Sequence, residues 1–266
     1  MKRRRVIVAG VIALALVGLT LSACSLSTGA ARGIGVLTSA PATSAPPAAA
    51  DGTDTFDTAM VNLDHGYTVV VKYAGLTATG RMDPAHRAAT IDFVGLEDGV
   101  HGDIAFTQIG SALWMKIDLG TVSRQQGIQP KVWYRLALSK ISDQDSLPFD
   151  LADEGDPLHV SDLFSAVADV HETDPTHVTG TVDLSQAGGS LSPDPDDVDD
   201  AGAVAKAEPF TLVLDESGRP AHLHLSGNHY LAMDFAFSHV GSPPGIKAPP
   251  ASDVRKATSA VYQFFG

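Results

Sequence analysis

From about residue 56 onward, apolar and polar residues alternate along short segments of this chain. In the clearest segment, Leu113, Met115 and Ile117 share one set of alternate positions, while Lys116 and Asp118 share the other. Successive side chains of a strand point to opposite faces, so this pattern predicts a strand with one buried face. Gly, Asp and Pro turn signals separate further segments of this kind. Strands are predicted at residues 67–73, 88–94, 104–109, 112–119, 132–136, 177–184, 210–215, 220–225 and 230–237.

Fewer segments have apolar residues at helical spacing, and they predict three helices. A brief helix is expected around residues 55–63, and a second begins where Asp156 precedes Pro157, a cap followed by proline at the first helical position. A third is capped by Ser252. The apolar stripes are Val160, Leu163, Phe164 and Val167 in the second helix, and Val254, Ala257, Val261, Tyr262 and Phe265 in the third. Many strands with few helices predict an α+β protein dominated by antiparallel sheet.

The first 24 residues differ from the rest. A basic cluster at residues 2–5 precedes an uncharged apolar run at 6–19, which is short for a membrane-spanning helix, so residues 1–23 are expected to be an export signal. The sequence Leu21-Ser22-Ala23-Cys24 resembles a bacterial lipobox. That resemblance implies cleavage before Cys24 and attachment of diacylglycerol to its thiol. The alternative is an uncleaved membrane anchor with an incidental cysteine.

Composition divides the remainder into two parts. Residues 24–52 hold the expected lipidated cysteine and a stretch rich in Ala, Ser, Thr and Pro, with few large apolar residues to offset the entropy of ordering it. We therefore expect a flexible tether there. Residues 53–266 form the expected folded domain, interrupted by an irregular acidic insertion at 185–206.

Charge narrows the range of partners. The formal net charge is −13, and loss of residues 1–23 would leave 14 Lys and Arg against 31 Asp and Glu. An acidic surface without an evident basic patch argues against nucleic acid as a partner, and against flat adsorption onto anionic lipid headgroups. Membrane attachment is therefore expected through the acyl chains on Cys24 alone. Because Cys24 is the only cysteine, no disulfide or thiol chemistry is expected in the domain.

Catalytic and metal motifs are weak. His222 and His224 lie two apart on a predicted strand with His229 nearby, which is compatible with a metal site or with a solvent-facing strand surface. The aspartates at 194–200 lack the spacing of a calcium loop and fit a solvated loop better. No nucleophile elbow, nucleotide loop or diagnostic pair of carboxylates is evident. Neither an enzyme nor a cofactor is expected.

Several short segments follow one another in a characteristic order. They are residues 114–118, 133–134, 139–140, 156–158, 179–184, 209–215, 218–220 and 237–238, with Gly241, Ile246 and Ala248-Pro249. In this order, and together with the lipobox, they resemble the LppX/LprG family of actinobacterial lipoproteins. The resemblance covers roughly residues 56–255.

The resemblance implies a fold similar to periplasmic lipoprotein carriers of the LolA type. In that fold a strongly curved antiparallel sheet, a half-barrel covered by a few helices, encloses an apolar cavity for acyl chains. It implies an extracytoplasmic, membrane-anchored protein that binds or carries a lipid or glycolipid. A partner transporter in the envelope stays unspecified. The alternative is a structural or interaction lipoprotein with a collapsed cavity.

The charged neighbours on each strand select the cavity-facing residues, because a charged side chain is costly in an apolar cavity. Leu163 and Phe164 are the expected lid over that face. If the cavity is absent, the same residues form a closed core. The candidates are Ile91, Phe93, Leu113, Met115, Ile117, Leu163, Phe164, Leu231, Met233 and Phe235.

Overall fold

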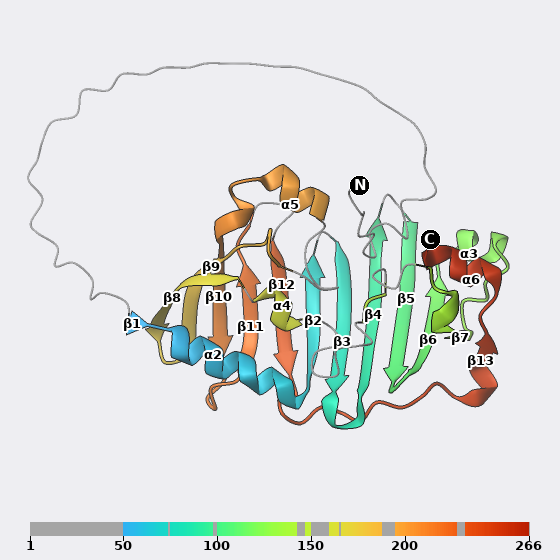
Figure 1. The fold of residues 1–266 in the computed structure, drawn as a ribbon, viewed down its shortest axis with the longest axis horizontal. Coiled ribbons are helices and arrows are strands. Elements are labelled where there is room, and N and C mark those ends of the chain that lie inside the picture. Colours follow the sequence, from blue (N-terminus) through green and yellow to red (C-terminus); the bar gives the residue numbers. More distant parts are fainter. Residues whose placement is uncertain are drawn as a thin grey trace, which may run out of the picture.

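One broad sheet organises the computed structural model of the chain (Figure 1), which describes residues 50–73, 75–97, 100–142, 147–149, 160–164, 166–187, 195–227 and 232–265. The described residues form thirteen strands in a single open sheet. The expected signal, Cys24 and most of the tether lie outside the described residues. The strands are β1 (Ala50–Asp51), β2 (Tyr67–Tyr73), β3 (Leu76–Asp83), β4 (Ala88–Glu97), β5 (Val100–Ile109), β6 (Ala112–Asp118), β7 (Trp133–Leu136), β8 (Val167–Asp174), β9 (His177–Val182), β10 (Glu208–Leu214), β11 (Pro220–Leu225), β12 (Met233–Ser238) and β13 (Val254–Lys256).

The strand order is β1-β8-β9-β10-β11-β12-β2-β3-β4-β5-β6-β7-β13. Two antiparallel runs of neighbouring strands, β8–β12 and β2–β7, meet where β12 pairs with β2. Only β13 pairs in parallel, and its partner is β7. The predicted α+β class with a mainly antiparallel sheet is therefore confirmed for the described part of the chain.

The helices are few and short. They are α2 (Thr53–Val61), α3 (Thr121–Gln125), α4 (Val160–Leu163), α5 (Pro195–Ala201) and α6 (Ser259–Tyr262). The helix expected near 55–63 is confirmed as α2, which buries Phe56 and Ala59 and continues as a 3-10 turn. Figure 1 shows α2 crossing the strands of the β8–β12 half.

Three sequence predictions need correction. Val167 is predicted on a helix but begins β8, because α4 has ended and the chain pairs with β9 instead. The helix predicted from Ser252 begins at Ser259, while Val254 starts β13. The insertion at 185–206, predicted to be irregular, contains α5. In addition, the sequence pattern does not predict β3 and β8 as strands.

The hairpin between β10 and β11 has the expected connection. Gly218 takes a φ of 77°, which glycine adopts at little cost, and Asp215 accepts hydrogen bonds from the backbone N–H groups of Ser217 and Arg219. Ala50 and Asp51, placed by sequence in the tether, pair with His171 and Glu172 of β8. The folded part thus includes the last residues of the expected tether.

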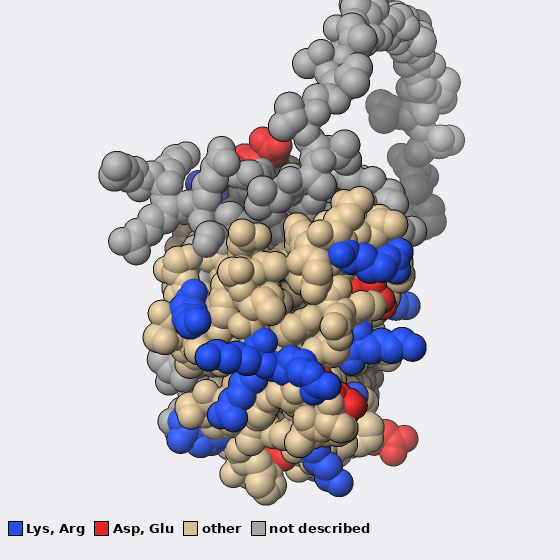
Figure 2. Space-filling view, turned by 90° about the vertical axis from the view of Figure 1, so that its right-hand side faces the viewer, with Lys and Arg blue, Asp and Glu red and all other residues tan. Residues whose placement is uncertain are grey.

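The surface is not uniformly acidic. Residues 112–140 carry five Lys and Arg and one Asp, whereas residues 167–225 carry twelve Asp and Glu and two Lys and Arg. Figure 2 views the end of the sheet formed by β6, β7 and β13 and shows Lys and Arg side chains crowded there. The sequence-based expectation that no basic patch exists is wrong at this end.

Candidate functional site

The inner face of the sheet, defined as the face carrying Val71, Phe93 and Ile117, is continuously apolar. Strand registers align nine buried residues in one row across nine strands, and each is at most 4 % exposed. The row is Val178, Leu212, Leu223, Phe235, Val71, Ala78, Phe93, Ile104 and Ile117. Because period-two alternation places every second residue on this face, the sheet presents one uninterrupted apolar surface.

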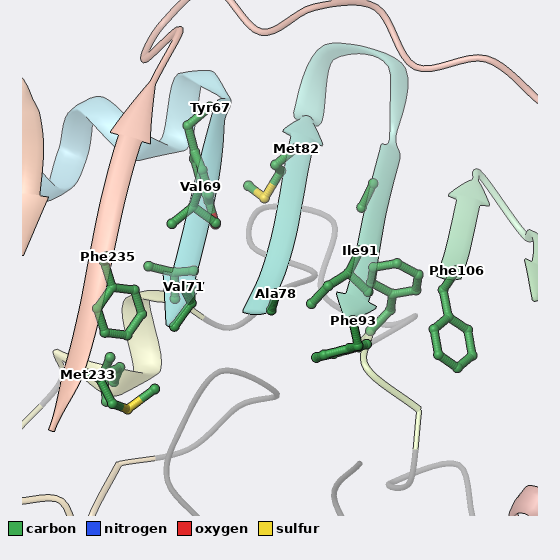
Figure 3. Close-up of a cluster of buried hydrophobic side chains, with 14 of the residues drawn as sticks. Tyr67, Val69, Val71, Ala78, Met82, Ile91, Phe93, Phe106, Met233 and Phe235 are labelled. Carbon is green, nitrogen blue, oxygen red and sulfur yellow. The ribbon is translucent and has the colours of Figure 1, made fainter. Parts of the chain in front are cut away.

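A second row of residues runs beside the first, and the two rows together show where the inner face carries its smallest side chains. Its order is Phe237, Val69, Gly80, Ile91, Phe106, Met115 and Tyr134. In both rows β3 contributes the smallest residue, Ala78 in the first and Gly80 in the second. Figure 3 shows the neighbouring side chains of β12, β2, β4 and β5 on the same side of the sheet as Ala78. The centre of the inner face therefore carries little side-chain volume from β3.

Aromatic rings form a connected group on one side of β3. Phe56 of α2 packs on Phe210 with ring centroids 5.5 Å apart and on Phe164 at 6.1 Å. Phe164, immediately after α4, packs edge-on against Phe235 at 6.4 Å. Phe235 stacks on Phe237 at 6.3 Å. Phe164 thus packs against the inner face, and Leu163 beside it is 1 % exposed, while the role of these two residues as a lid over a cavity stays a prediction.

A second aromatic group lies on the other side of β3. Phe106 contacts Phe149 at 6.3 Å and Phe265 at 6.5 Å between ring centroids. Phe106 is also the register partner of both Ile91 and Met115, two of the predicted residues. Side chains from distant parts of the sequence thus meet around one phenyl ring.

The predicted inner-face residues fall where the alternation places them. Nine of the ten are described, and all nine belong to one apolar cluster with exposures from 0 to 6 %; Leu231, like Cys24, lies outside the described residues. Asp234, used to choose the face of its strand, is exposed on the opposite side. These findings settle the faces of the strands and leave the cavity a proposal. The prediction missed Val71, Ala78, Gly80, Met82 and Phe106 of the inner face, and Phe56 of α2, which packs on it.

The inner face also carries one carboxyl group. Glu208, at the start of β10, is 0 % exposed and shares a face with Phe210 and Leu212. Neither carboxyl oxygen of Glu208 has a hydrogen-bond partner. Burial raises the pKa of Glu208, and the nearby His224 offsets only part of that effect. This carboxyl therefore keeps its proton to a higher pH than an exposed glutamate does.

The histidines of β11 lie on the outer face. His222 and His224 are exposed, as expected for a solvent-facing strand surface, and Nδ1 of His224 lies 2.7 Å from Oδ1 of Asp234 on β12. His229 lies outside the described residues. Within the described part of the chain, no group of three His, Cys, Asp or Glu side chains is arranged to hold a metal ion.

Comparisons with known proteins add little. No family model and no curated protein matches the chain. Among solved structures, an uncharacterized conserved protein from Thermus thermophilus is similar with a TM-score of 0.32 and 11 % identity, covering 77 % of this chain and 99 % of that one. At this TM-score the likeness carries no argument about fold or function. Among the described helices, none has both the length and the apolar character needed to span a membrane.

Proposed function

We propose that this protein is an extracytoplasmic lipoprotein, anchored by acyl chains on Cys24, that binds or carries the acyl chains of a lipid or glycolipid against the inner face of its sheet. The observation that carries the proposal is the combination of a continuous apolar face with small residues at its centre. Ala78 and Gly80 lie between two aromatic groups, so an unbranched chain could follow β3 with phenyl rings on both sides. The proposal includes a LolA-like half-barrel with a cavity at that position.

Physical chemistry explains why this function needs no polar motif. Each buried methylene contributes about 0.8 kcal/mol, so a single long acyl chain can bind through apolar contacts alone. Met82, Met115 and Met233 all belong to the inner face, each at most 2 % exposed. Methionine has an unbranched, adaptable side chain, which suits a wall that meets chains of different length.

A second function is favoured by one specific observation. The nine described candidate residues are at most 6 % exposed and pack within one cluster. Such packing fits a closed core, and with it a structural or interaction lipoprotein of the cell envelope that carries no ligand. The two functions differ in whether open space lies beside Ala78.

Replacement of Ala78 by phenylalanine tests that difference. If space lies beside β3, Ala78→Phe fills it, costs less than about 1 kcal/mol of stability and lowers uptake of a fluorescent fatty acid. The control is Thr79→Phe, which adds a ring one residue away on the outer face, where Thr79 is partly exposed. Unfolding of the Ala78→Phe protein, or unchanged uptake, would show that the core is closed there.

Two mass-spectrometry experiments test the remaining parts of the proposal, namely the bound lipid and the lipid anchor. Native mass spectrometry of residues 50–266, purified from a lipid-containing host, should show co-purified lipid in the wild type and less of it in Ala78→Phe, Met115→Trp and Met233→Trp. Separately, intact mass of the processed full-length protein should correspond to a chain that begins at Cys24 with added acyl groups. A processed chain without lipid, or a Cys24→Ala protein still held in the membrane, would contradict the anchor and leave the acyl-chain site untouched.

A further inference from the structure

The outer face of β6, β7 and β13, opposite the apolar inner face, carries an ordered array of cations. The registers place Trp114, Arg135 and Lys256 side by side in one row across the three strands. Lys116 belongs to the neighbouring row, beside Trp133. Cations and aromatic rings therefore alternate both along β6 and β7 and between them.

The rings support these cations without neutralising them. The Lys116 ammonium lies 5.1 Å from the centroid of Trp133, and the Arg135 guanidinium lies 5.8 Å from that of Trp114. Attraction to the face of a ring fixes a cation in position and leaves its charge intact. In the part of the chain that the structure describes, none of Lys116, Arg135 and Lys256 forms an ion pair with a carboxylate, although Asp92 of β4 attracts Lys116 from a longer distance.

More cations surround this array. We call the array and these surrounding cations together the basic face. Arg124, Lys131 and Lys140 come from the segments beside β6 and β7, and all three are exposed. Arg255 of β13 is not one of them, because its register partner is Tyr134 of the inner face. Asp118 at the end of β6 and Asp253 just before β13 are the acidic residues of these segments. Asp118 accepts a hydrogen bond from the backbone N–H of Gly120, and Asp253 accepts one from the Ser252 hydroxyl. Figure 2 shows how Lys and Arg dominate this end of the molecule.

We propose that the basic face binds the headgroups of an anionic lipid bilayer. A flat bilayer presents many phosphates at once, and a face of several unpaired cations is complementary to it. The rest of the protein is strongly acidic and is repelled by the same surface, so docking would be confined to this one face. The proposal is independent of acyl-chain binding on the inner face. It also replaces the expectation that headgroup adsorption is excluded.

Two other occupants fit the structure less well. A single-stranded nucleic acid binds by stacking bases on exposed aromatic rings, but Trp114 is only 9 % exposed and lies beneath Arg135. The acidic end of a second copy is also complementary in charge. However, Asp174, Asp183 and Asp215 of that end already accept hydrogen bonds from their own turns, and the net charge of −13 opposes association between copies.

The tryptophans make the proposal directly measurable. Trp114 and Trp133 are the only tryptophans in the chain, so intrinsic fluorescence reports on the basic face alone. We would reconstitute the full-length chain into phosphatidylcholine vesicles with and without 30 mol% phosphatidylglycerol, chosen as about a third of the lipid to approach an anionic leaflet. Energy transfer from tryptophan to a dansyl-labelled lipid headgroup then measures how close this face lies to the bilayer.

We expect stronger transfer in the anionic vesicles and loss of the difference at high salt, where charges at the surface are screened. The triple variant Lys116→Gln/Arg135→Gln/Lys256→Gln should weaken docking by about fivefold for each charge removed. The control triple variant Lys72→Gln/Arg81→Gln/Lys206→Gln changes the net charge equally at exposed positions outside this face and should dock normally. Lys256→Gln alone, at an exposed edge, covers the case in which the triple variant fails to fold.

Several results would overturn the proposal. Equal transfer in neutral and anionic vesicles would do so, as would equal losses in both triple variants. Salt-sensitive dimerisation in solution, abolished by the basic-face variant without any effect on vesicles, would assign the face to a second copy. Fatty-acid uptake measured in the same variants should not change, which separates failure of this proposal from failure of the acyl-chain site.

Discussion

The two ends of the sheet hold opposite charges by different means. At the opposite end, formed by β1 and β8–β11, several aspartates belong to local turns. Each of four aspartates accepts hydrogen bonds from the backbone N–H and the hydroxyl of the residue two positions later. The pairs are Asp51 with Thr53, Asp174 with Thr176, Asp183 with Ser185, and Asp215 with Ser217. These carboxylates shape the backbone beside them.

At the β6–β7–β13 end, three of the cations, Lys116, Arg135 and Lys140, lie over aromatic rings supplied by a neighbouring element. Lys116 of β6 lies over Trp133 of β7, and Lys140 lies over Tyr262 of α6 with its Nζ 5.6 Å from the ring centroid. Lys140 and Tyr262 are brought together by the docking of residues 254–265. The comparison teaches that the acidic end is organised by local sequence and the basic end by topology.

The largest expected effect comes from the aromatic groups that support each end. Phe106→Ala removes the ring that contacts Phe149 and Phe265, and Phe210→Ala removes the ring that contacts Phe56. Each should cost about 3–5 kcal/mol of the free energy of unfolding, because loss of a buried phenyl ring leaves a cavity. Hydrogen exchange should rise first near residues 259–265 in Phe106→Ala and first in α2 in Phe210→Ala. Identical exchange patterns in the two variants would show that the ends are not separable.

Glu208 gives the next largest effect and a definite pH dependence. Its folded-state pKa is raised above the unfolded value of 4.5, so the folded state binds the proton more tightly. Stability is therefore highest below the unfolded pKa and falls as pH rises from there through the folded pKa. Glu208→Gln should add about 1–2 kcal/mol at neutral pH by removing the unpartnered carboxylate, and should flatten this slope. Urea unfolding at several pH values measures both, and a less stable Gln variant at neutral pH would contradict the assignment.

The smallest effect concerns a single turn of the acidic end. Asp215→Ala removes hydrogen bonds to the turn of the β10–β11 hairpin and should cost about 0.5–1 kcal/mol. Hydrogen bonds from Arg219 and Ser217 lower the pKa of Asp215 below 3.8. Its contribution is thus present above pH 3.8 and is lost as pH falls through the folded pKa. Lys116→Met at the other end is the comparison, with a smaller change expected; an equal loss would mean that the basic end also depends on local contacts.

Local pattern is sufficient where one face of a strand is strongly apolar. In β6, Leu113, Met115 and Ile117 alternate with charged residues, and the structure buries them as predicted. In β3, the inner positions include Ala78 and Gly80, whose weak hydrophobicity conceals the same alternation. These small residues are the basis of the proposed acyl-chain site on β3, and they are also the reason why the sequence pattern does not predict a strand there.

Long-range pairing explains the remaining errors. Val254 fits a helical stripe with Ala257 and Val261, but pairing with Trp133 of β7 draws it into a strand. Val167 similarly fits the stripe of α4 until β9 is available as its partner. The basic face also cannot be predicted from local sequence, because long-range pairing brings together cations from segments more than a hundred residues apart. Only the register of β13 against β7 shows that they adjoin.

The connection from β12 to β13 imposes an order on folding. Residues 239–253 leave β12 in the middle of the sheet and cross to its far edge (Figure 1), tied on the way by the hydrogen bond from Gly241 N–H to the Gly66 carbonyl. Val254 then pairs with Trp133, so the parallel ladder between β13 and β7 closes a loop of about 120 residues, whose entropic cost grows with its length. Contacts of this separation form slowly. Until they form, β7 pairs with β6 alone and its other edge is open to the wrong partner. How long the edge of β7 stays open therefore depends on residues 239–256, which are distant from β7 in the sequence although they end beside it in the fold.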